Sequence, residues 1–265
     1  MRGTWLILTV LAISGPAARA DWWYTYEASD GTFPEQQGFY RATMGAGGQR
    51  WFEDGAFVLD TSTDPGIVDF YYRSMPSLPD PNDPTHAFVC EWGLRIDSFI
   101  GWRNPEVFLA FQGYADMGLQ YELDGVYSLY GGQRVADFAP GVFHAYRLVT
   151  SDMVIYTLEI DGMPVYTGEL SPWAPTSFVK FGDGMDAAAS ASCWQYVRYG
   201  VVSALVGDAN CDGTVDFGDI NPFIGVLTVP AGMPGCGVMN ADINQDGAVD
   251  FADINPFVDL MLQVR

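Results

Sequence analysis

Two acidic loops carry the residues of this chain best suited to chemistry. They begin 34 residues apart, at Asp208 and Asp242, and each places oxygen-bearing residues at loop positions 1, 3, 5, 9 and 12 with a glycine at position 6. Calcium takes six to eight oxygen ligands at roughly 2.3–2.6 Å, so a short loop binds it only when alternate residues converge on one point. Gly213 and Gly247 permit the sharp turn, because glycine reaches positive φ without steric cost. The spacing therefore predicts two bound calcium ions.

The ligand set follows from the loop positions. Position 7 supplies a backbone carbonyl, so its side chain is unconstrained, and position 12 is an aspartate whose two oxygens would close the sphere. The predicted metal ligands are Asp208, Asn210, Asp212, Thr214, Asp216, Asp219, Asp242, Asn244, Asp246, Ala248, Asp250 and Asp253.

A helix is expected to follow each loop and to position its last ligand. The pentapeptide Asp-Ile-Asn-Pro-Phe occurs at 219–223 and again at 253–257, each time before an apolar stretch. If the aspartates cap helices, the prolines fall in the first helical turn, where backbone N–H groups lack intrahelical partners anyway. The sequence thus predicts two repeats, 208–227 and 242–262, each a loop followed by a helix.

These repeats resemble a type I dockerin module over about residues 206–263, and Asp-Ile-Asn-Pro-Phe is similar to the dockerin-like tails of secreted planctomycete proteins. The resemblance implies a small helical, EF-hand-like domain at 203–265 that binds two calcium ions. It also implies docking onto a cohesin-like domain or a cell-surface protein. Dockerins help choose their partner through loop positions 10 and 11, often hydroxyl residues, which are Phe217-Gly218 and Phe251-Ala252 here. The alternative interpretation is an acidic, solvated tail.

Residues 1–20 have the order of a cleavable signal peptide. Arg2 precedes an apolar run from Trp5 to Ile13, and Ala18-Arg19-Ala20 supplies the small-residue cleavage site. The apolar run is much shorter than the roughly 20 residues that span a bilayer. We therefore expect a secreted protein, extracellular or associated with the cell surface, without membrane insertion.

The net charge of −21 excludes some partners. Residues 203–265 carry −8 and the first twenty carry +2, which leaves −15 on residues 21–202. Such an acidic chain should repel nucleic acid and anionic membranes.

Four cysteines in an exported chain predict disulfides. Pairing within each domain gives Cys211 with Cys236 and Cys90 with Cys193. For the second pair, two buried thiols remain the alternative.

Residues 21–202 read as one β-rich domain. Phe88–Ile96 and Val154–Asp161 alternate between apolar and polar residues, as half-buried strands do. Asp-Gly pairs at 54–55, 124–125 and 161–162 suit tight type I′ hairpins, and Pro164 then requires an edge or bulge position. Such signals at short intervals favour an antiparallel β-sandwich.

The runs Gly141–Val149 and Tyr156–Val165 resemble the central hairpin of concanavalin-like jelly rolls, the laminin-G and legume-lectin group, and Ala191–Tyr199 is similar to their final strand. The resemblance implies a mainly β chain: a jelly-roll sandwich over 21–202, followed by the small helical domain. That fold hosts sugar-binding lectins, glycan hydrolases and adhesion modules, so it does not name a function.

Motifs for catalysis are weak. Jelly-roll glycan hydrolases carry E-x-D-x-x-E on one strand, and the nearest pairs here are Glu91 with Asp97 and Glu159 with Asp161. Neither pair completes the motif, so we predict no catalytic residues. Trp102 and Trp173 lie in Gly/Pro-rich segments and are candidates for an exposed sugar-binding platform.

Three hypotheses follow. The leading one is a secreted, non-catalytic protein with a polysaccharide-binding sandwich and a calcium-dependent docking module. The second is a dockerin-bearing glycan hydrolase or lyase, and the third is a structural component of an extracellular matrix or envelope.

Overall fold

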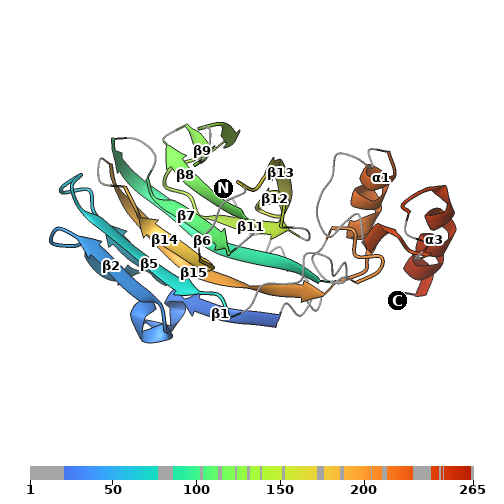
Figure 1. The fold of residues 1–265 in the computed structure, drawn as a ribbon, viewed down its shortest axis with the longest axis horizontal. Coiled ribbons are helices and arrows are strands. Elements are labelled where there is room, and N and C mark those ends of the chain that lie inside the picture. Colours follow the sequence, from blue (N-terminus) through green and yellow to red (C-terminus); the bar gives the residue numbers. More distant parts are fainter. Residues whose placement is uncertain are drawn as a thin grey trace, which may run out of the picture.

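The computed structural model is a β-sandwich followed by a smaller helical segment (Figure 1). It describes residues 21–76, 86–101, 104–112, 115–122, 124–129, 132–137, 139–150, 153–171, 176–185, 188–203, 205–210, 214–228, 240–244, 246 and 248–263. The predicted leader, 1–20, lies outside these residues.

Sheet A contains the longest strands of the described residues. Its order is β13-β12-β11-β6-β15-β4-β3, and β1 also pairs with β15. All pairs in this sheet are antiparallel. The bounds are β1 Asp21–Glu27, β3 Gln49–Glu53, β4 Ala56–Asp60, β6 His86–Ile100, β11 His144–Thr150, β12 Ile155–Ile160, β13 Met163–Glu169 and β15 Ala189–Ser203.

Sheet B packs against sheet A, and its order is β10-β9-β8-β7-β14-β5-β2. Its pairs are antiparallel as well. The bounds are β2 Tyr40–Met44, β5 Val68–Ser74, β7 Glu106–Phe111, β8 Ala115–Glu122, β9 Gly125–Ser128, β10 Arg134–Ala136 and β14 Phe178–Asp183. Two short 3-10 turns, Ala28–Asp30 and Pro34–Gln37, connect β1 to β2. The predicted antiparallel β-sandwich is confirmed.

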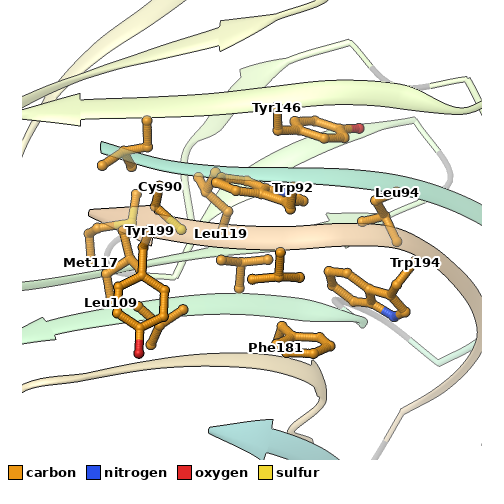
Figure 2. Packing of buried hydrophobic residues seen from close by; sticks show 14 of the residues in the cluster. Cys90, Trp92, Leu94, Leu109, Met117, Leu119, Tyr146, Phe181, Trp194 and Tyr199 are labelled. Carbon is orange, nitrogen blue, oxygen red and sulfur yellow. The ribbon is translucent and has the colours of Figure 1, made fainter. Parts of the chain in front are cut away.

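The core lies between the two sheets (Figure 2). Cys90, Trp92 and Leu94 on β6 are fully buried, as the alternation of Phe88–Ile96 predicts. Trp92 stacks on Tyr146 with ring centroids 5.4 Å apart and 4° between the planes. Its indole N–H also donates a 2.9 Å hydrogen bond to the hydroxyl of Tyr121 on β8, so this residue joins the two sheets.

Two of the three predicted Asp-Gly turns have the expected backbone. Asp54-Gly55 and Asp161-Gly162 all have positive φ and close the β3–β4 and β12–β13 hairpins. Pro164 lies on the edge strand β13 beside a register shift, as predicted.

The third turn and one strand end differ from the prediction. Gly125 pairs with Glu122 and belongs to β9, so the turn residues come one position earlier than predicted. Val154 precedes β12 and is 56% exposed, because the strand begins at Ile155.

The C-terminal segment has its own hydrophobic cluster, formed by both repeats. Helices α1 (Ile220–Thr228) and α3 (Ile254–Gln263) each follow a 3-10 turn, Phe217–Asp219 and Phe251–Asp253. Phe223 of α1 stacks on Phe257 of α3 at 4.1 Å, which pairs equivalent positions of the two repeats. The prolines fall in the first turn of each helix, as predicted. Among the described helices, none combines the length and apolar character needed to cross a bilayer.

Candidate functional sites

The outward surface of sheet A carries a row of opposite charges. Glu159, Arg147, Glu91 and Arg198 stand opposite one another on β12, β11, β6 and β15. Arg147 lies 3.2 Å from Glu91 and 3.4 Å from Glu159, and Arg198 lies 2.7 Å from Glu91. Both glutamates weighed as catalytic candidates are therefore held by arginines.

The aspartates of the same two candidate pairs are also engaged. Asp97 pairs with Arg95 at 2.8 Å, and Asp161 lies 2.7 Å from Nδ1 of His144. Partial burial raises the pKa of Asp161, but hydrogen bonds from His144 and from the Ala145 N–H outweigh it, so the pKa lies below its usual value. None of these four carboxylates faces a second one across an open site. They act as surface ion pairs.

The outward surface of sheet B is aromatic instead. Tyr40, Tyr72, Lys180 and Phe108 stand opposite one another on the neighbouring strands β2, β5, β14 and β7, which lie side by side in Figure 1. We call this line the aromatic row. Tyr40 is 63% exposed and stacks obliquely on Tyr72 at 5.6 Å, and Phe108 stacks on Phe178 at 5.6 Å. The row spans three inter-strand spacings, about 14 Å.

A polar group lies beside the aromatic row. The Lys180 ammonium is 5.0 Å from the ring centre of Phe70 and 5.3 Å from that of Phe108, and it forms an ion pair with Glu106. Glu106 is 3% exposed and stands opposite Gln120, which is 1% exposed. The amide nitrogen of Gln120 has no hydrogen-bond partner among the described residues. A buried donor without a partner costs stability.

A second buried carboxylate, Asp183, joins the sheets at one end of β14. It accepts hydrogen bonds from the Thr61 hydroxyl, at the end of β4, and from the Met185 N–H. Burial raises the pKa of Asp183 to about 6, and nearby Glu106 adds to this effect while Thr61 and Asn104 oppose it. At pH 7 the fold thus carries an ionised carboxylate that is 0% exposed.

Asp183→Asn should stabilise the sandwich at neutral pH. Because the folded-state pKa lies above the unfolded value, the stability associated with the protonated carboxyl is present near pH 4 and is lost as pH rises through 6. We expect the variant to gain about 1–3 kcal/mol at pH 7 and little at pH 4. Urea unfolding at both pH values, followed by tryptophan fluorescence, measures this. Asp30→Asn, at an exposed position, should keep the wild-type pH dependence; an equal gain at both pH values would contradict the assignment.

The last residue of each acidic loop accepts hydrogen bonds from backbone N–H groups of the same loop. Asp253 is fully buried, and its carboxylate accepts N–H hydrogen bonds from Ile243, Asn244 and Asp250 at 2.7–3.0 Å. Asp219 does the same in the first loop with the N–H groups of Asn210 and Asp216. The residue that caps each helical segment is at loop position 9. The side chain of Asp216 accepts a hydrogen bond from the backbone N–H two residues later, and Asp250 does the same in the second loop. Capping by Asp219 and Asp253, as considered from the sequence, is wrong, because the 3-10 turn starts the helix earlier.

The second loop shows where its oxygens point. Oδ1 of Asp242 and Oδ1 of Asn244 lie 3.1 and 2.9 Å from the N–H of Asp246, so positions 1 and 3 converge inside the loop. The described residues contain no group of three or more Asp, Glu, His or Cys side chains at metal-binding spacing. Calcium loops of this length also use amide and backbone oxygens. Asp212, position 5 of the first loop, lies outside the described residues. The described donors are carboxylate and amide oxygens, which are ligands that calcium takes.

An apolar surface is repeated on the helical segment. Phe217 and Phe251, at loop position 10, are 77% and 82% exposed, and Ile224 and Val258 on the helices are 50% and 48% exposed. We call these four residues the paired apolar surface.

The predicted Cys90–Cys193 disulfide is wrong. Both cysteines are buried and free. Cys90 stands opposite Tyr199 and Cys193 opposite Arg95, which separates them by five residues, about 17 Å, along β6. A disulfide needs Cα atoms within about 7 Å. Burial raises the pKa of Cys193 to about 12, so it stays a thiol.

The remaining site predictions concern four residues. Trp102, Trp173 and the Cys211–Cys236 pair lie outside the described residues. The aromatic row was not predicted from the sequence. It takes the place of Trp102 and Trp173 as the candidate sugar-binding surface among the described residues.

Comparison with known proteins supports the fold of the sandwich. No protein-family model matches the chain, and no curated protein matches it. Among solved structures, a carbohydrate esterase from the Shiga toxin-encoding bacteriophage phi24B matches with a TM-score of 0.52 at 13% identity, covering 68% of this chain and 97% of that one.

Two other matches are more distant. Domain 4 of AbnA, a GH43 extracellular arabinanase from Geobacillus stearothermophilus solved with arabinotriose, gives a TM-score of 0.46 at 14% identity, over 69% of this chain and 94% of that one. A sialidase gives 0.43 at 11% identity, over 82% of this chain but 21% of its own length. At 13% identity the likeness to the phage esterase shows the fold alone, which is a β-sandwich.

Proposed function

We propose that this is an exported, non-catalytic polysaccharide-binding protein, attached to a partner through a calcium-loaded dockerin-like module. The aromatic row carries the proposal for the sandwich. Sheet A covers its outward surface with paired charges, whereas sheet B leaves Tyr40, Tyr72 and Phe108 in a line across four strands. Half-buried aromatic rings in an open line offer flat apolar surfaces on which the faces of sugar rings can stack.

The described carboxylates favour binding over hydrolysis. A glycan hydrolase needs two carboxyl groups about 5–9.5 Å apart that flank the scissile bond. Glu106, beside the aromatic row, is paired with Lys180. Asp183 belongs to the core-facing side of β14, since its neighbour in alternation, Phe181, lies in the core. Both carboxyl groups are buried and already engaged, Glu106 with Lys180 and Asp183 with the Thr61 hydroxyl and the Met185 N–H, so neither is presented to a sugar bond at the surface.

The calcium proposal rests on the loop geometry. The residues that would hold the ions are the predicted ligands of the two loops, with Asp219 and Asp253 closing them. The sequence of residues 203–265 contains nine aspartates, no lysine and one arginine, so this segment carries a charge of −8. A bound calcium ion supplies positive charge that offsets the cost of burying the carboxylates of Asp219 and Asp253. Oδ2 of Asp253 accepts one N–H, from Asp250, and so retains a lone pair for the metal, whereas Oδ1 accepts two.

The docking proposal rests on the paired apolar surface. Phe217 and Phe251 are large, exposed and repeated in register, and exposed apolar groups of this size mark interaction sites. They replace the hydroxyl residues frequent at the same loop positions of dockerins. A cohesin-like partner would therefore present an apolar groove rather than a polar one, with basic residues facing Asp216 and Asp250.

A glycan array with the calcium-loaded mature chain tests the sandwich. We expect binding to one class of polysaccharide, and Tyr72→Ala combined with Phe108→Ala should weaken it at least about tenfold. Tyr196→Ala, which removes an aromatic residue beside Arg198 on sheet A, is the matched control and should bind normally. Unchanged binding by the double variant would sink the assignment of this surface.

A further inference from the structure

Lys180 is the only lysine in the 265-residue chain. It occupies the middle of the aromatic row, between Tyr72 on β5 and Phe108 on β7. Every other cationic side chain is an arginine, and several of these serve ion pairs on sheet A or at strand ends. Lysine offers three freely rotating donors, whereas arginine offers a rigid fork suited to carboxylates and phosphates.

The lysine and its neighbours make one compact polar group. In the row of outward residues next to the aromatic row, Phe70, Gly182, Glu106 and Gln120 stand opposite one another. Gly182 has no side chain, and Lys180 reaches across this gap to contact both the Phe70 ring and the Glu106 carboxylate. The Gln120 amide nitrogen, unpartnered among the described residues, comes next in line.

We propose that Lys180, held in place by the buried Glu106 carboxylate, is the specificity-determining residue of the sugar-binding surface and selects neutral glycans over acidic ones. This inference rests on the proposed function of the sandwich. A neutral sugar hydroxyl can accept from the partly exposed Lys180 ammonium, whose charge the buried Glu106 carboxylate already balances. A glycan carboxylate only accepts, and it would compete with Glu106 for the single ammonium while approaching a buried negative charge.

The long-range field acts in the same direction. Residues 21–202 carry −15 within the total of −21. Such a charge repels uronic-acid polymers and sulfated polymers at low and moderate salt. Because Glu106 already balances the charge of Lys180, this lysine does not reverse that repulsion. Its ammonium group is left to hydrogen-bond sugar hydroxyls.

Isothermal titration of the full, calcium-loaded chain provides the test. The neutral probes are cellohexaose, xylohexaose and mannohexaose, and the acidic probe is hexagalacturonic acid. We expect a neutral probe to bind at least tenfold more tightly than the acidic one. Lys180→Met should weaken the neutral probe at least tenfold. Glu106→Gln, which frees the lysine charge, should strengthen hexagalacturonic acid at least fivefold while weakening the neutral probe.

A second measurement needs no variant. Limited acetylation modifies one ε-amine in this chain, and mass spectrometry follows it without ambiguity. A bound neutral hexasaccharide should slow acetylation of Lys180 at least fivefold, while the α-amine reacts at an unchanged rate.

The outcomes separate this inference from the proposed function. Tighter binding of the acidic probe, no change in specificity in Glu106→Gln, or no protection of Lys180 by a bound neutral probe overturns the role of this group. These results leave the aromatic row intact as long as Tyr72→Ala with Phe108→Ala still abolishes binding. If no probe binds and the array is also negative, the proposed function itself fails.

Discussion

Excess EGTA should melt the helical module and leave the sandwich folded. Residues 203–265 contain neither tryptophan nor tyrosine. The tryptophan fluorescence and the tryptophan circular dichroism near 290 nm therefore report on the sandwich alone. The signal at 222 nm instead reports largely on α1 and α3. We expect EGTA to remove the helical signal, calcium to restore it, and the tryptophan signals to stay constant.

The physical reason is preferential binding to the folded state. An ion present at 100 times its dissociation constant stabilises the fold by about 2.7 kcal/mol, and two sites add to one another. The module has a small core around Phe223 and Phe257, which gives it little stability of its own. Removing the ions also leaves the buried carboxylates of Asp219 and Asp253 without their counter-charge.

A pair of variants sharpens the calcium test. Asp253→Asn removes the charge that closes the second loop and leaves one acceptor oxygen where three N–H groups converge. It should weaken calcium binding at least tenfold. Asp259→Asn changes an exposed acid on α3, outside both loops, and should titrate like the wild type. A 222 nm signal that persists unchanged in EGTA would refute the calcium assignment.

Trp92→Ala should be among the most damaging single changes to the sandwich. Trp92 is fully buried and stacks on Tyr146 (Figure 2). It also hydrogen-bonds Tyr121 on the opposite sheet. Emptying such a site removes apolar contacts and leaves a cavity, which costs about 3–5 kcal/mol. Urea unfolding followed by the fluorescence of the remaining tryptophans measures the loss.

Two further variants show why Trp92→Ala loses stability. Trp92→Phe keeps a ring but removes the indole donor, so it should cost less than the alanine variant. Trp51→Ala removes the same side chain from β3, where it is 38% exposed, and should change stability by roughly 0.5 kcal/mol or less. If Trp92→Ala lost no more stability than Trp51→Ala, Trp92 would not be the residue that joins the sheets.

Local signals in the sequence predicted local structure well. Alternation placed Cys90, Trp92 and Leu94 in the core, and the Asp54-Gly55 and Asp161-Gly162 turns have the required positive φ. The helices after the acidic loops were also predictable, because each signal lies within about twenty residues of the structure it specifies.

The aromatic row was not predictable from such signals. Its members come from positions 40, 72, 108 and 180, and they meet only because β14 inserts between β5 and β7. Alternation assigns each residue to a side of its own strand, but it does not give the order of strands in a sheet. The cysteine pairing failed for a related reason: the register of β6 against β15 keeps Cys90 and Cys193 apart. The lone lysine was visible in the sequence and was the available clue.

The scarcity of basic residues has a consequence for how long the two parts of this protein stay together. Between Arg198, inside β15, and Arg265 there is no lysine or arginine. Proteases of trypsin specificity therefore find no cleavage site in the connection between sandwich and module, even when calcium is withdrawn and the helices unfold. In surroundings rich in such enzymes, the sandwich would keep its covalent connection to the helical module.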